Sequence, residues 1–213
     1  MKQIATYQKL RGGYYTPEPI ADFLAQWVVQ HSNAHVLEPS CGDGILLYAA
    51  TKTLIEHGAA FSDIPELVQG VEFDSQESRK ASERLATIDS LPSVPIHNED
   101  FFSYCYAHLS QKRYFDAVIG NPPFIRYQNF PEEQRKFAFY FMQLAGLHPS
   151  RLTNAWVPFL VTSSLLLKDT GRLAMVIPAE LLQVNYAAEL RYFLSNFYQS
   201  ITIVTFKKLV FEG

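Results

Sequence analysis

The chain has 213 residues, of which 48% are hydrophobic and 18% charged, and its net charge is −3. This balance is typical of a globular protein with ample material for a core, and the length suits one large domain, alone or with a short appendage. The negative charge argues against a domain dedicated to coating nucleic acid, although an enzyme can take its DNA affinity from another domain.

The N-terminal region and the cysteines exclude further classes. No signal-peptide pattern opens the chain, and its longest apolar stretch, near residues 159–167, is too short to span a bilayer, so no membrane association is expected. Cys41 and Cys105 have neither metal-binding nor redox spacing, so no metal is expected. Their sparse use favours a reduced, cytoplasmic setting.

Short apolar runs alternate with amphipathic helical patterns along the chain, which is typical of a parallel sheet crossed by helices. Thr16 is a suitable N-cap for the first helix, whose first turn tolerates the prolines at 17 and 19. The expected helices span residues 20–29, 45–57, 75–86, 131–146, 154–167 and 179–197. The expected strands span residues 35–38, 67–73, 94–97, 115–119, 173–177 and 201–206. This order predicts an α/β fold with a doubly wound, Rossmann-like sheet and helices on both faces.

In doubly wound sheets ligands bind beyond the carboxyl ends of the strands, so the residues that follow each strand matter most. After the first strand, residues 38–44 read Glu-Pro-Ser-Cys-Gly-Asp-Gly, where two glycines permit positive φ angles and close approach of a ligand. The following helix offers unpaired N–H groups to a carboxylate or phosphate. A plain turn explains such a loop equally well. The absence of a Gly-x-Gly-x-x-Gly pattern argues against NAD or FAD.

Acidic residues follow the second and third strands. Glu72 is suited to accept hydrogen bonds from two ribose hydroxyls, and a carboxylate on a buried strand end needs a partner. The neighbouring Asp74 fits a helix N-cap. Asp100 stands beside Phe101, where it could accept from an adenine amino group while a ring packs on the base. Taken alone, it is equally a loop acid beside core phenylalanines.

The sequence Asn121-Pro122-Pro123-Phe124 follows the fourth strand and is the most informative feature. Successive prolines remove two N–H donors, fix both φ angles and keep Asn121 out of the helical region. The loop therefore presents acceptors, the Asn121 side-chain oxygen and a backbone carbonyl, beside the flat face of Phe124. Such a pair suits a planar group that carries an NH₂, whereas a simple strand terminator is the structural alternative.

The chain resembles the N6-adenine DNA methyltransferases of restriction-modification systems. Within them it is similar to the gamma-class subgroup, whose cofactor motifs precede the catalytic motif. Five segments carry the resemblance in the family's order: residues 11–18 (RGGYYTPE), 37–44 (LEPSCGDG), 70–74 (GVEFD), 100–102 (DFF) and 116–124 (DAVIGNPPF). The Asn-Pro-Pro-aromatic segment is the most specific element for amino-group methylation. Tyr-Tyr-Thr-Pro best separates the DNA enzymes from their relatives.

The resemblance implies a class I methyltransferase fold, S-adenosylmethionine as cofactor and no metal. The methionine end would lie against the Thr16 segment and the loop 38–44, the ribose on Glu72, and the adenine between Phe73 and Phe159. The implied cofactor residues are Thr16, Glu38, Ser40, Cys41, Gly42, Gly44, Glu72, Phe73, Asp100, Phe101 and Phe159. The implied catalytic residues are Asn121, Pro122, Pro123 and Phe124, with Phe124 and Phe211 stacking on the target base.

The resemblance also implies double-stranded DNA as substrate, a target adenine flipped out of the duplex, and a cognate restriction endonuclease as a possible partner. Such enzymes continue into a closing strand and a DNA-recognition region. We therefore expect residues 1–213 to form one cofactor-binding catalytic domain, truncated before those parts, with DNA recognised through the missing region or a partner chain. Candidate DNA contacts, each equally explained as ordinary surface, are Arg126, Arg135, Lys136, Arg151, Lys207 and Lys208.

Other readings of the same motifs stay open. Amino-group methylation of an RNA base or of a protein glutamine uses the same Asn-Pro-Pro-Phe chemistry. N4-cytosine methylation is a lesser alternative, because serine is commoner there at the position of Asn121. A different class of protein, a non-catalytic regulatory subunit that keeps the fold, is opposed by the intact Asn121 loop and by Glu72.

Overall fold

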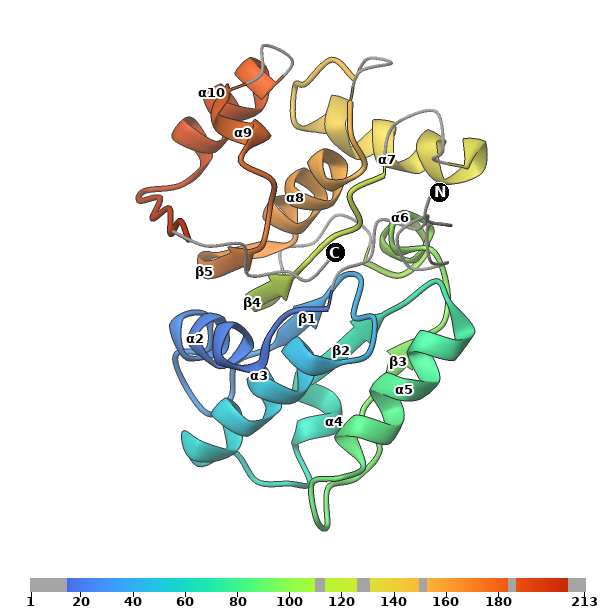
Figure 1. Cartoon of the computed structure of the whole chain (residues 1–213), viewed down its shortest axis with the longest axis vertical. Coiled ribbons are helices and arrows are strands. Elements are labelled where there is room, and N and C mark those ends of the chain that lie inside the picture. Colours follow the sequence, from blue (N-terminus) through green and yellow to red (C-terminus); the bar gives the residue numbers. More distant parts are fainter. Residues whose placement is uncertain (1–14, 110–113, 126–130, 150–152, 184–186, 207–213) are drawn as a thin grey trace, which may run out of the picture.

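The computed structural model of the chain describes residues 15–109, 114–125, 131–149, 153–183 and 187–206. Its centre is a five-stranded sheet in the order β3-β2-β1-β4-β5 (Figure 1). The strands are β1 (Val36–Glu38), β2 (Val68–Val71), β3 (Ile96–His97), β4 (Phe115–Gly120) and β5 (Leu167–Met175). Every neighbouring pair is parallel. The strand order reverses between β1 and β4, which places the ligand-binding edge of the sheet there.

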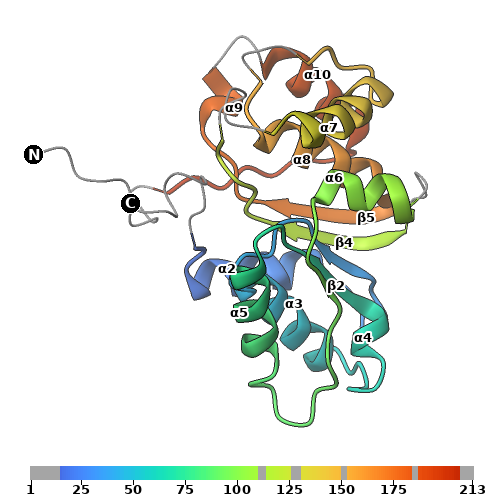
Figure 2. The same cartoon turned by 90° about the vertical axis from the view of Figure 1, so that its right-hand side faces the viewer.

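Helices cover both faces of this sheet, as predicted. Among the described elements, one face carries α2 (Glu18–Val28), α3 (Ile45–Glu56), α4 (Ile64–Leu67) and α5 (Ser75–Leu85). The other face carries α6 (Phe101–Tyr104), the π-helical turn η1 (Cys105–Leu109), α7 (Glu132–Leu144) and α8 (Trp156–Leu165). The side view in Figure 2 separates the two layers, with α9 (Glu180–Gln183) and α10 (Ala188–Phe197) beyond the second layer.

The alternation of side chains along the strands explains why both faces are covered. Val36 of β1 and Ala117 of β4 belong to the core cluster under α2 and α3, whereas Leu37 and Val118 belong to the cluster under α6, α7 and α8. Successive residues of a strand point to opposite faces, so a strand that is apolar at every position must be buried on both sides. The predicted doubly wound α/β sheet is therefore confirmed.

Helix α8 differs from the others because residues 156–164 are buried on every side. It lies between the strands and the outer helices, where it contacts α7 and β5. Among its polar side chains, Ser164 donates to the Leu160 carbonyl at 2.8 Å and accepts from the Tyr198 hydroxyl at 2.8 Å, whereas the buried Thr162 and Ser163 hydroxyls have no partner among the described residues. A helix that is buried all round supports the sheet rather than presenting a surface.

Several predicted boundaries were wrong. Strand β5 begins at Leu167, six residues earlier than the predicted 173, because Lys168 pairs with Asp116 of β4 and Gly171 lets the chain pass close to the Phe115 carbonyl. The predicted helix 179–197 consists of two shorter helices, α9 and α10, with residues 184–186 outside the described part. The sequence pattern did not predict α4, α6 and η1, because helices of four or five residues are too short to show a helical period.

The predicted sixth strand at residues 201–206 is also wrong. These residues are exposed and have no regular secondary structure, and they pair with none of the described strands. Their alternating apolar residues resemble a strand, but a strand forms only where a neighbour accepts its hydrogen bonds. Across the described ranges, no helix combines the length and apolar character needed to cross a membrane.

Candidate active site

The loops that follow β1, β2 and β3 are joined by hydrogen bonds at the carboxyl edge of the sheet. The Cys41 amide donates to the Val71 carbonyl at 3.0 Å, and the Glu72 amide donates to the His97 carbonyl at 2.9 Å. The side chain of Asn98 then donates to the Glu72 carbonyl at 2.8 Å. The predicted cofactor segments are therefore brought together, and Asn98, to which the sequence assigned no role, holds two of them in register.

The two glycines of the loop after β1 have different tasks. Both adopt positive φ angles, 51° at Gly42 and 80° at Gly44, which glycine tolerates and other residues rarely do. A Cβ on Gly44 would lie 2.8 Å from atoms of Ala81 in α5, so this glycine allows close packing of the loop on that helix. A Cβ on Gly42 would meet nothing within 4 Å. Gly42 therefore presents its backbone on the open side of the loop.

Buried polar atoms of Glu38 and Ser40 stand at the end of β1. Glu38 is 2% exposed, and within the described residues neither its Oε2 nor the Ser40 Oγ has a hydrogen-bond partner. Burial raises the pKa of Glu38 well above its ordinary value, and the charges of Asp43 and Glu72 add to the shift, whereas the Leu47 N–H opposes it. Buried polar atoms normally have a partner, so this pair is compatible with a ligand that carries hydrogen-bond donors.

Glu72 binds the glycine loop directly. Its Oε2 accepts from the Gly42 amide at 2.8 Å, and its Oε1 accepts from the Asp74 amide at 2.8 Å. Burial raises the pKa of Glu72, although both backbone hydrogen bonds pull it down. A carboxylate oxygen can accept more than one hydrogen bond, so these contacts are compatible with the predicted ribose contact. The neighbouring Phe73 is 65% exposed, so its ring is accessible to a flat ligand.

The aromatic residues predicted beside the cofactor adenine are part of the core. Phe101 is 2% and Phe159 is 6% exposed, and the two rings stack on each other with centroids 5.2 Å apart and planes 11° apart. Asp100 caps α6, because its Oδ1 accepts from the Ser103 amide and hydroxyl at 2.9 Å. Burial raises the pKa of Asp100. These residues border the site, and their faces are turned mainly to each other.

Cys41 also has an inward-facing side chain. Its sulfur packs against Gly70, where an added Cβ would lie 3.1 Å from it. Burial raises the pKa of the thiol well above its ordinary value, followed by the charges of Glu38 and Glu72. The neutral thiol therefore shapes the loop, and the loop's backbone faces outward.

Asn121 follows β4 directly and contacts a residue 105 positions earlier. Its Nδ2 donates to the Thr16 Oγ1 at 3.2 Å, and Thr16 is 5% exposed. The prediction that Thr16 caps α2 was wrong, because Pro17 is the N-cap and Thr16 faces Asn121 instead. With its nitrogen committed to Thr16, the amide presents its oxygen at the opposite end. The structure thus joins the predicted cofactor segment to the predicted catalytic loop.

The rest of the Asn-Pro-Pro-Phe loop is held from behind. Pro122 is buried, Pro123 is half-buried, and Phe124 is half-buried against the core cluster of α7, α8 and α10. The carbonyl of Ile125 accepts from the Ala155 amide at 2.9 Å at the start of α8. Phe211 and residues 11–14 lie outside the described residues, so their predicted roles stay predictions.

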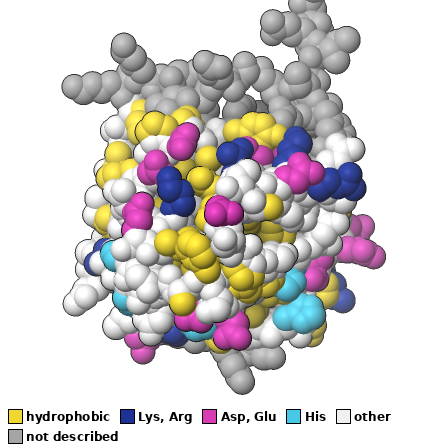
Figure 3. Space-filling view, turned by 90° about the horizontal axis from the view of Figure 1, so that it is seen from below, with side chains coloured by type: hydrophobic (Ala, Val, Ile, Leu, Met, Phe, Trp, Pro, Cys, Tyr) yellow, Lys and Arg dark blue, Asp and Glu magenta, His cyan; other side chains and the backbone are white. Residues whose placement is uncertain are grey.

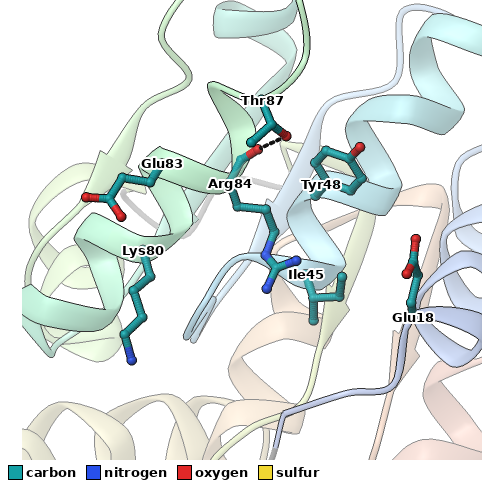
Figure 4. Close-up of a pocket in the computed structure, with 7 residues that line it drawn as sticks. All are labelled: Glu18, Ile45, Tyr48, Lys80, Glu83, Arg84 and Thr87. Carbon is teal, nitrogen blue, oxygen red and sulfur yellow. Dashed lines mark hydrogen bonds between the residues drawn. The ribbon is translucent and has the colours of Figure 1, made fainter.

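A groove lies behind the glycine loop, between α3 and α5 (Figure 4). It encloses about 440 Å³ and contains none of the predicted cofactor or catalytic residues. Its lining residues are Glu18, Ile45, Tyr48, Lys80, Glu83, Arg84 and Thr87. Arg84 reaches from α5 toward Ile45 at the start of α3. It donates to the Asp43 side chain at 2.5 Å and to the Asp43 carbonyl at 2.9 Å. Sequence reasoning gave no role to this pair.

Comparison with known proteins places the chain in a family. The sequence model of the Eco57I restriction-modification methylases matches residues 45–211. This chain belongs to the Eco57I restriction-modification methylase family. The chain is 30% identical over 183 residues to the type II methyltransferase M.XamI of Xanthomonas campestris pv. amaranthicola. The matched segment covers 84% of this chain and 32% of M.XamI. The type II methyltransferase M.HincII of Haemophilus influenzae is 28% identical over 203 residues, which are 95% of this chain and 35% of M.HincII.

Solved structures show the same fold. A class I S-adenosylmethionine-dependent methyltransferase from Listeria monocytogenes matches 92% of this chain and 54% of its own chain with a TM-score of 0.64 and 20% identity. The type IIG restriction endonuclease BpuSI matches 88% of this chain and 23% of its own with a TM-score of 0.66 and 20% identity. This methylase chain thus spans about a third of the length of the curated relatives it matches.

S-adenosylmethionine is the cofactor of this fold and family. The carboxyl edge of the sheet fits it chemically. Its methionine end carries an ammonium group, which supplies the donors that the buried Glu38 and Ser40 oxygens lack among the described residues. The backbone of Gly42 lies on the open side of the loop, and Phe73 offers an exposed ring. The same edge carries Asn121.

Proposed function

We propose that this methylase domain transfers a methyl group from S-adenosylmethionine to the N6 amino group of an adenine flipped out of double-stranded DNA, within a restriction-modification system. The observation that carries the proposal is the hydrogen bond between Asn121 and Thr16. It puts an Asn-Pro-Pro-Phe loop, which is suited to a flat amino group, directly against the segment that precedes the cofactor loops. A cytoplasmic location fits this role.

The chain's own residues would hold the cofactor at three points. Glu38 and Ser40 would accept from the ammonium of the methionine end, Glu72 would accept from the ribose hydroxyls, and Phe73 would lie against the adenine. Glu72 remains oriented for this task because two backbone amides fix its oxygens at 2.8 Å. Bound in this way, the cofactor supplies a methyl group on a sulfonium, so the protein needs no covalent nucleophile.

The catalytic loop would act on the target nitrogen. An amino nitrogen conjugated to a purine is flat and weakly nucleophilic, because its lone pair is delocalised into the ring. The Asn121 oxygen and the Pro122 carbonyl would accept its two protons out of the ring plane, which turns the lone pair toward the methyl group. These are preorganised dipoles aimed at the transition state. Phe124 would stack on the flipped base, a contact worth about 1–3 kcal/mol.

Thr16 has a specific part in this arrangement. In the structure its hydroxyl accepts from the Asn121 nitrogen, an orientation that would leave the amide oxygen for the substrate. An amide turned the other way would offer donors to an amino group that is itself a donor. The short path from Thr16 to Asn121 also ties the position of the catalytic loop to that of the cofactor segment.

Recognition of a DNA sequence would need a further region or a partner chain, such as a cognate endonuclease subunit. The net charge of −3 gives little long-range attraction to phosphates. The face of the molecule in Figure 3 shows basic and acidic side chains side by side rather than a continuous basic surface. Arg135 and Lys136 of α7 are the described candidates for phosphate contacts. The other four candidates lie outside the described residues.

The direct test is to identify the methylated product. The protein purified from its native host is incubated with S-adenosylmethionine carrying a labelled methyl group and, separately, unmethylated plasmid DNA, transfer RNA and protein extract. Nucleosides and amino acids are then resolved by mass spectrometry. N6-methyladenine in DNA supports the proposal. Label found instead in N4-methylcytosine, transfer RNA or protein glutamine would overturn the substrate assignment, and no transfer at all would favour a regulatory subunit.

A further inference from the structure

One face of α5 contacts both segments that flank the proposed cofactor site. Glu77, Lys80, Ala81 and Arg84 are spaced by three, four and seven residues from Glu77, so their side chains lie along one side of the helix. We call these four residues the α5 anchor face. In the sequence the face reads as an ordinary charged helix surface, and only the structure shows what it touches.

The first half of the anchor face holds the segment that leads into Thr16. The Tyr15 hydroxyl donates to the Glu77 carboxylate at 3.0 Å and accepts from the Lys80 ammonium at 3.2 Å. Lys80 also lies 5.8 Å from the centre of the Tyr15 ring and 2.8 Å from Glu77. Tyr15 directly precedes Thr16, so these contacts set where the Thr16 hydroxyl stands relative to Asn121.

The second half holds the glycine loop. Arg84 makes two hydrogen bonds to Asp43, one to its side chain and one to its carbonyl, which hold the residue that lies between Gly42 and Gly44. Ala81 lies so close to Gly44 that no other side chain fits there. The residue before Asp43 is Gly42, and its amide donates to the Glu72 carboxylate. Arg84 is therefore two contacts away from the proposed ribose acceptor.

The helix itself is tied to the same site. Asp74 caps α5 by accepting from the Gln76 and Glu77 amides at 3.0 Å, and the Asp74 amide donates to Glu72 at 2.8 Å. A binding site supported by a packed helix holds its geometry better than one supported by loops alone. A movement of α5 would thus change the Thr16 segment, the glycine loop and Glu72 together.

We propose that the α5 anchor face positions both segments that hold S-adenosylmethionine, and that Tyr15 and Arg84 are positioning residues for cofactor binding. This inference rests on the proposed function. The alternative is that these contacts only stabilise the fold. The Arg84 and Asp43 side chains are 36% and 15% exposed, and ion pairs this close to solvent contribute little to folding. Their effect should therefore appear in cofactor affinity more than in stability.

The test measures cofactor affinity by calorimetry in the whole protein and its melting temperature alongside. Arg84→Gln removes the charge that holds Asp43, and we expect about tenfold weaker binding of S-adenosylmethionine, the loss typical of one charge-assisted hydrogen bond. Arg84→Lys restores a charge at the same place and should recover part of the affinity. Tyr15→Phe keeps the ring but removes the hydroxyl, and we expect a loss of a few-fold.

Two control variants separate positioning from a general effect on folding. Arg79 is exposed on the same helix away from the anchor face, so Arg79→Gln should bind the cofactor as the parent does. Asp116→Asn weakens an ion pair far from the site, so it should lower the melting temperature without changing affinity. Cofactor KM should rise in Arg84→Gln while the KM for the methyl acceptor stays the same.

The outcomes are distinct. Weaker binding in Arg84→Gln and Tyr15→Phe, partial recovery in Arg84→Lys and unchanged binding in Arg79→Gln support the inference. Parent-like affinity in a folded Arg84→Gln variant would overturn it while leaving the proposed function intact, as would an equal loss in Arg79→Gln. If Arg84→Gln does not fold, parent-like affinity in both Arg84→Lys and Tyr15→Phe would overturn it. A parent protein that binds no cofactor would overturn the proposed function as well.

Discussion

Two carboxylates at opposite ends of neighbouring parallel strands show how this sheet divides its tasks. Glu38 ends β1 at the carboxyl edge, where it is buried and its Oε2 finds no partner among the described residues. Asp116 lies near the start of β4, where its Oδ2 accepts from the Lys168 ammonium at 2.8 Å and from the His35 amide at 2.9 Å. The first carboxylate has an oxygen without a partner among the described residues, and the second is satisfied by the protein.

The same contrast appears in their acidity. Burial, followed by neighbouring negative charge, raises the pKa of Glu38 well above its ordinary value. Burial alone would also raise the pKa of Asp116, but the hydrogen bonds from Lys168 and the His35 amide hold it below its ordinary value. The protein itself therefore satisfies the carboxylate at the amino edge more fully, and we propose that the carboxyl edge is the one that binds a ligand, as expected for this class of sheet.

The largest effect should come from removing the catalytic acceptor at the carboxyl edge. Asn121→Ala should lower methyl-transfer turnover by about 100-fold or more, the usual loss when one preorganised transition-state contact is removed. Cofactor affinity should stay within a few-fold, because Asn121 would act on the target nitrogen. Single-turnover kinetics and calorimetry measure the two quantities. Equal losses in both would mean that Asn121 mainly shapes the cofactor pocket.

A smaller but still large effect is expected from the ribose acceptor. Glu72→Ala should weaken S-adenosylmethionine binding by about 2 kcal/mol, the range for charge-assisted hydrogen bonds. The variant also releases the Gly42 amide, so the glycine loop loses a contact that orients it. Fluorescence or calorimetric titration checks the value. Unchanged affinity in Glu72→Ala would contradict the assignment of the ribose to this edge.

The pH dependence of stability should distinguish the two edges. The folded-state pKa of Glu38 is raised, so its contribution to the free energy of unfolding is fully present below the ordinary pKa of 4.5. This contribution is lost as the pH rises through the pKa that Glu38 has in the folded protein. The pKa of Asp116 is lowered, so its contribution to the free energy of unfolding is present above the ordinary pKa of 3.8. This contribution is lost as the pH falls through the pKa that Asp116 has in the folded protein.

Urea unfolding between pH 5 and pH 8 would measure the Glu38 effect, which a single carboxyl limits to about 1.4 kcal/mol per pH unit. Relative to the parent, Glu38→Gln should remove part of the decline in the free energy of unfolding as pH rises. Glu72 and Asp100, whose pKa values are also raised, should supply the decline that remains. Identical pH profiles for parent and variant would contradict the account of Glu38.

The smallest effect should come from exchanging the two carboxylates for amides at pH 7. Asp116→Asn should lower the free energy of unfolding by about 1 kcal/mol, since Lys168 is 40% exposed and such pairs are screened by solvent. Glu38→Gln should not lower it, because the carboxyl group that it replaces is buried and has no ion pair among the described residues. Chemical denaturation gives both values. A larger loss in Glu38→Gln would reverse the proposed division between the edges.

The alternation of apolar runs with helical patterns was enough to predict the parallel sheet, and the order of its strands brings the candidate residues to one edge. Asn121-Pro122-Pro123 is an unusual strand terminator, and Asp74 is indeed the N-cap that its position suggested. The course of β5 could not be predicted, because Lys168 and its polar neighbours read as a turn until Lys168 meets Asp116, 52 residues away. The contact between Thr16 and Asn121 spans 105 residues and has no local pattern at all.

The most direct test of the central claim, that the carboxyl edge is the cofactor site, compares S-adenosylmethionine binding by calorimetry in the parent, Glu38→Gln and Asp116→Asn. We expect one cofactor per chain, about tenfold weaker binding in Glu38→Gln because the ammonium loses a carboxylate acceptor, and parent-like binding in Asp116→Asn. Parent-like affinity in Glu38→Gln together with a loss in Asp116→Asn would place the cofactor away from the carboxyl edge.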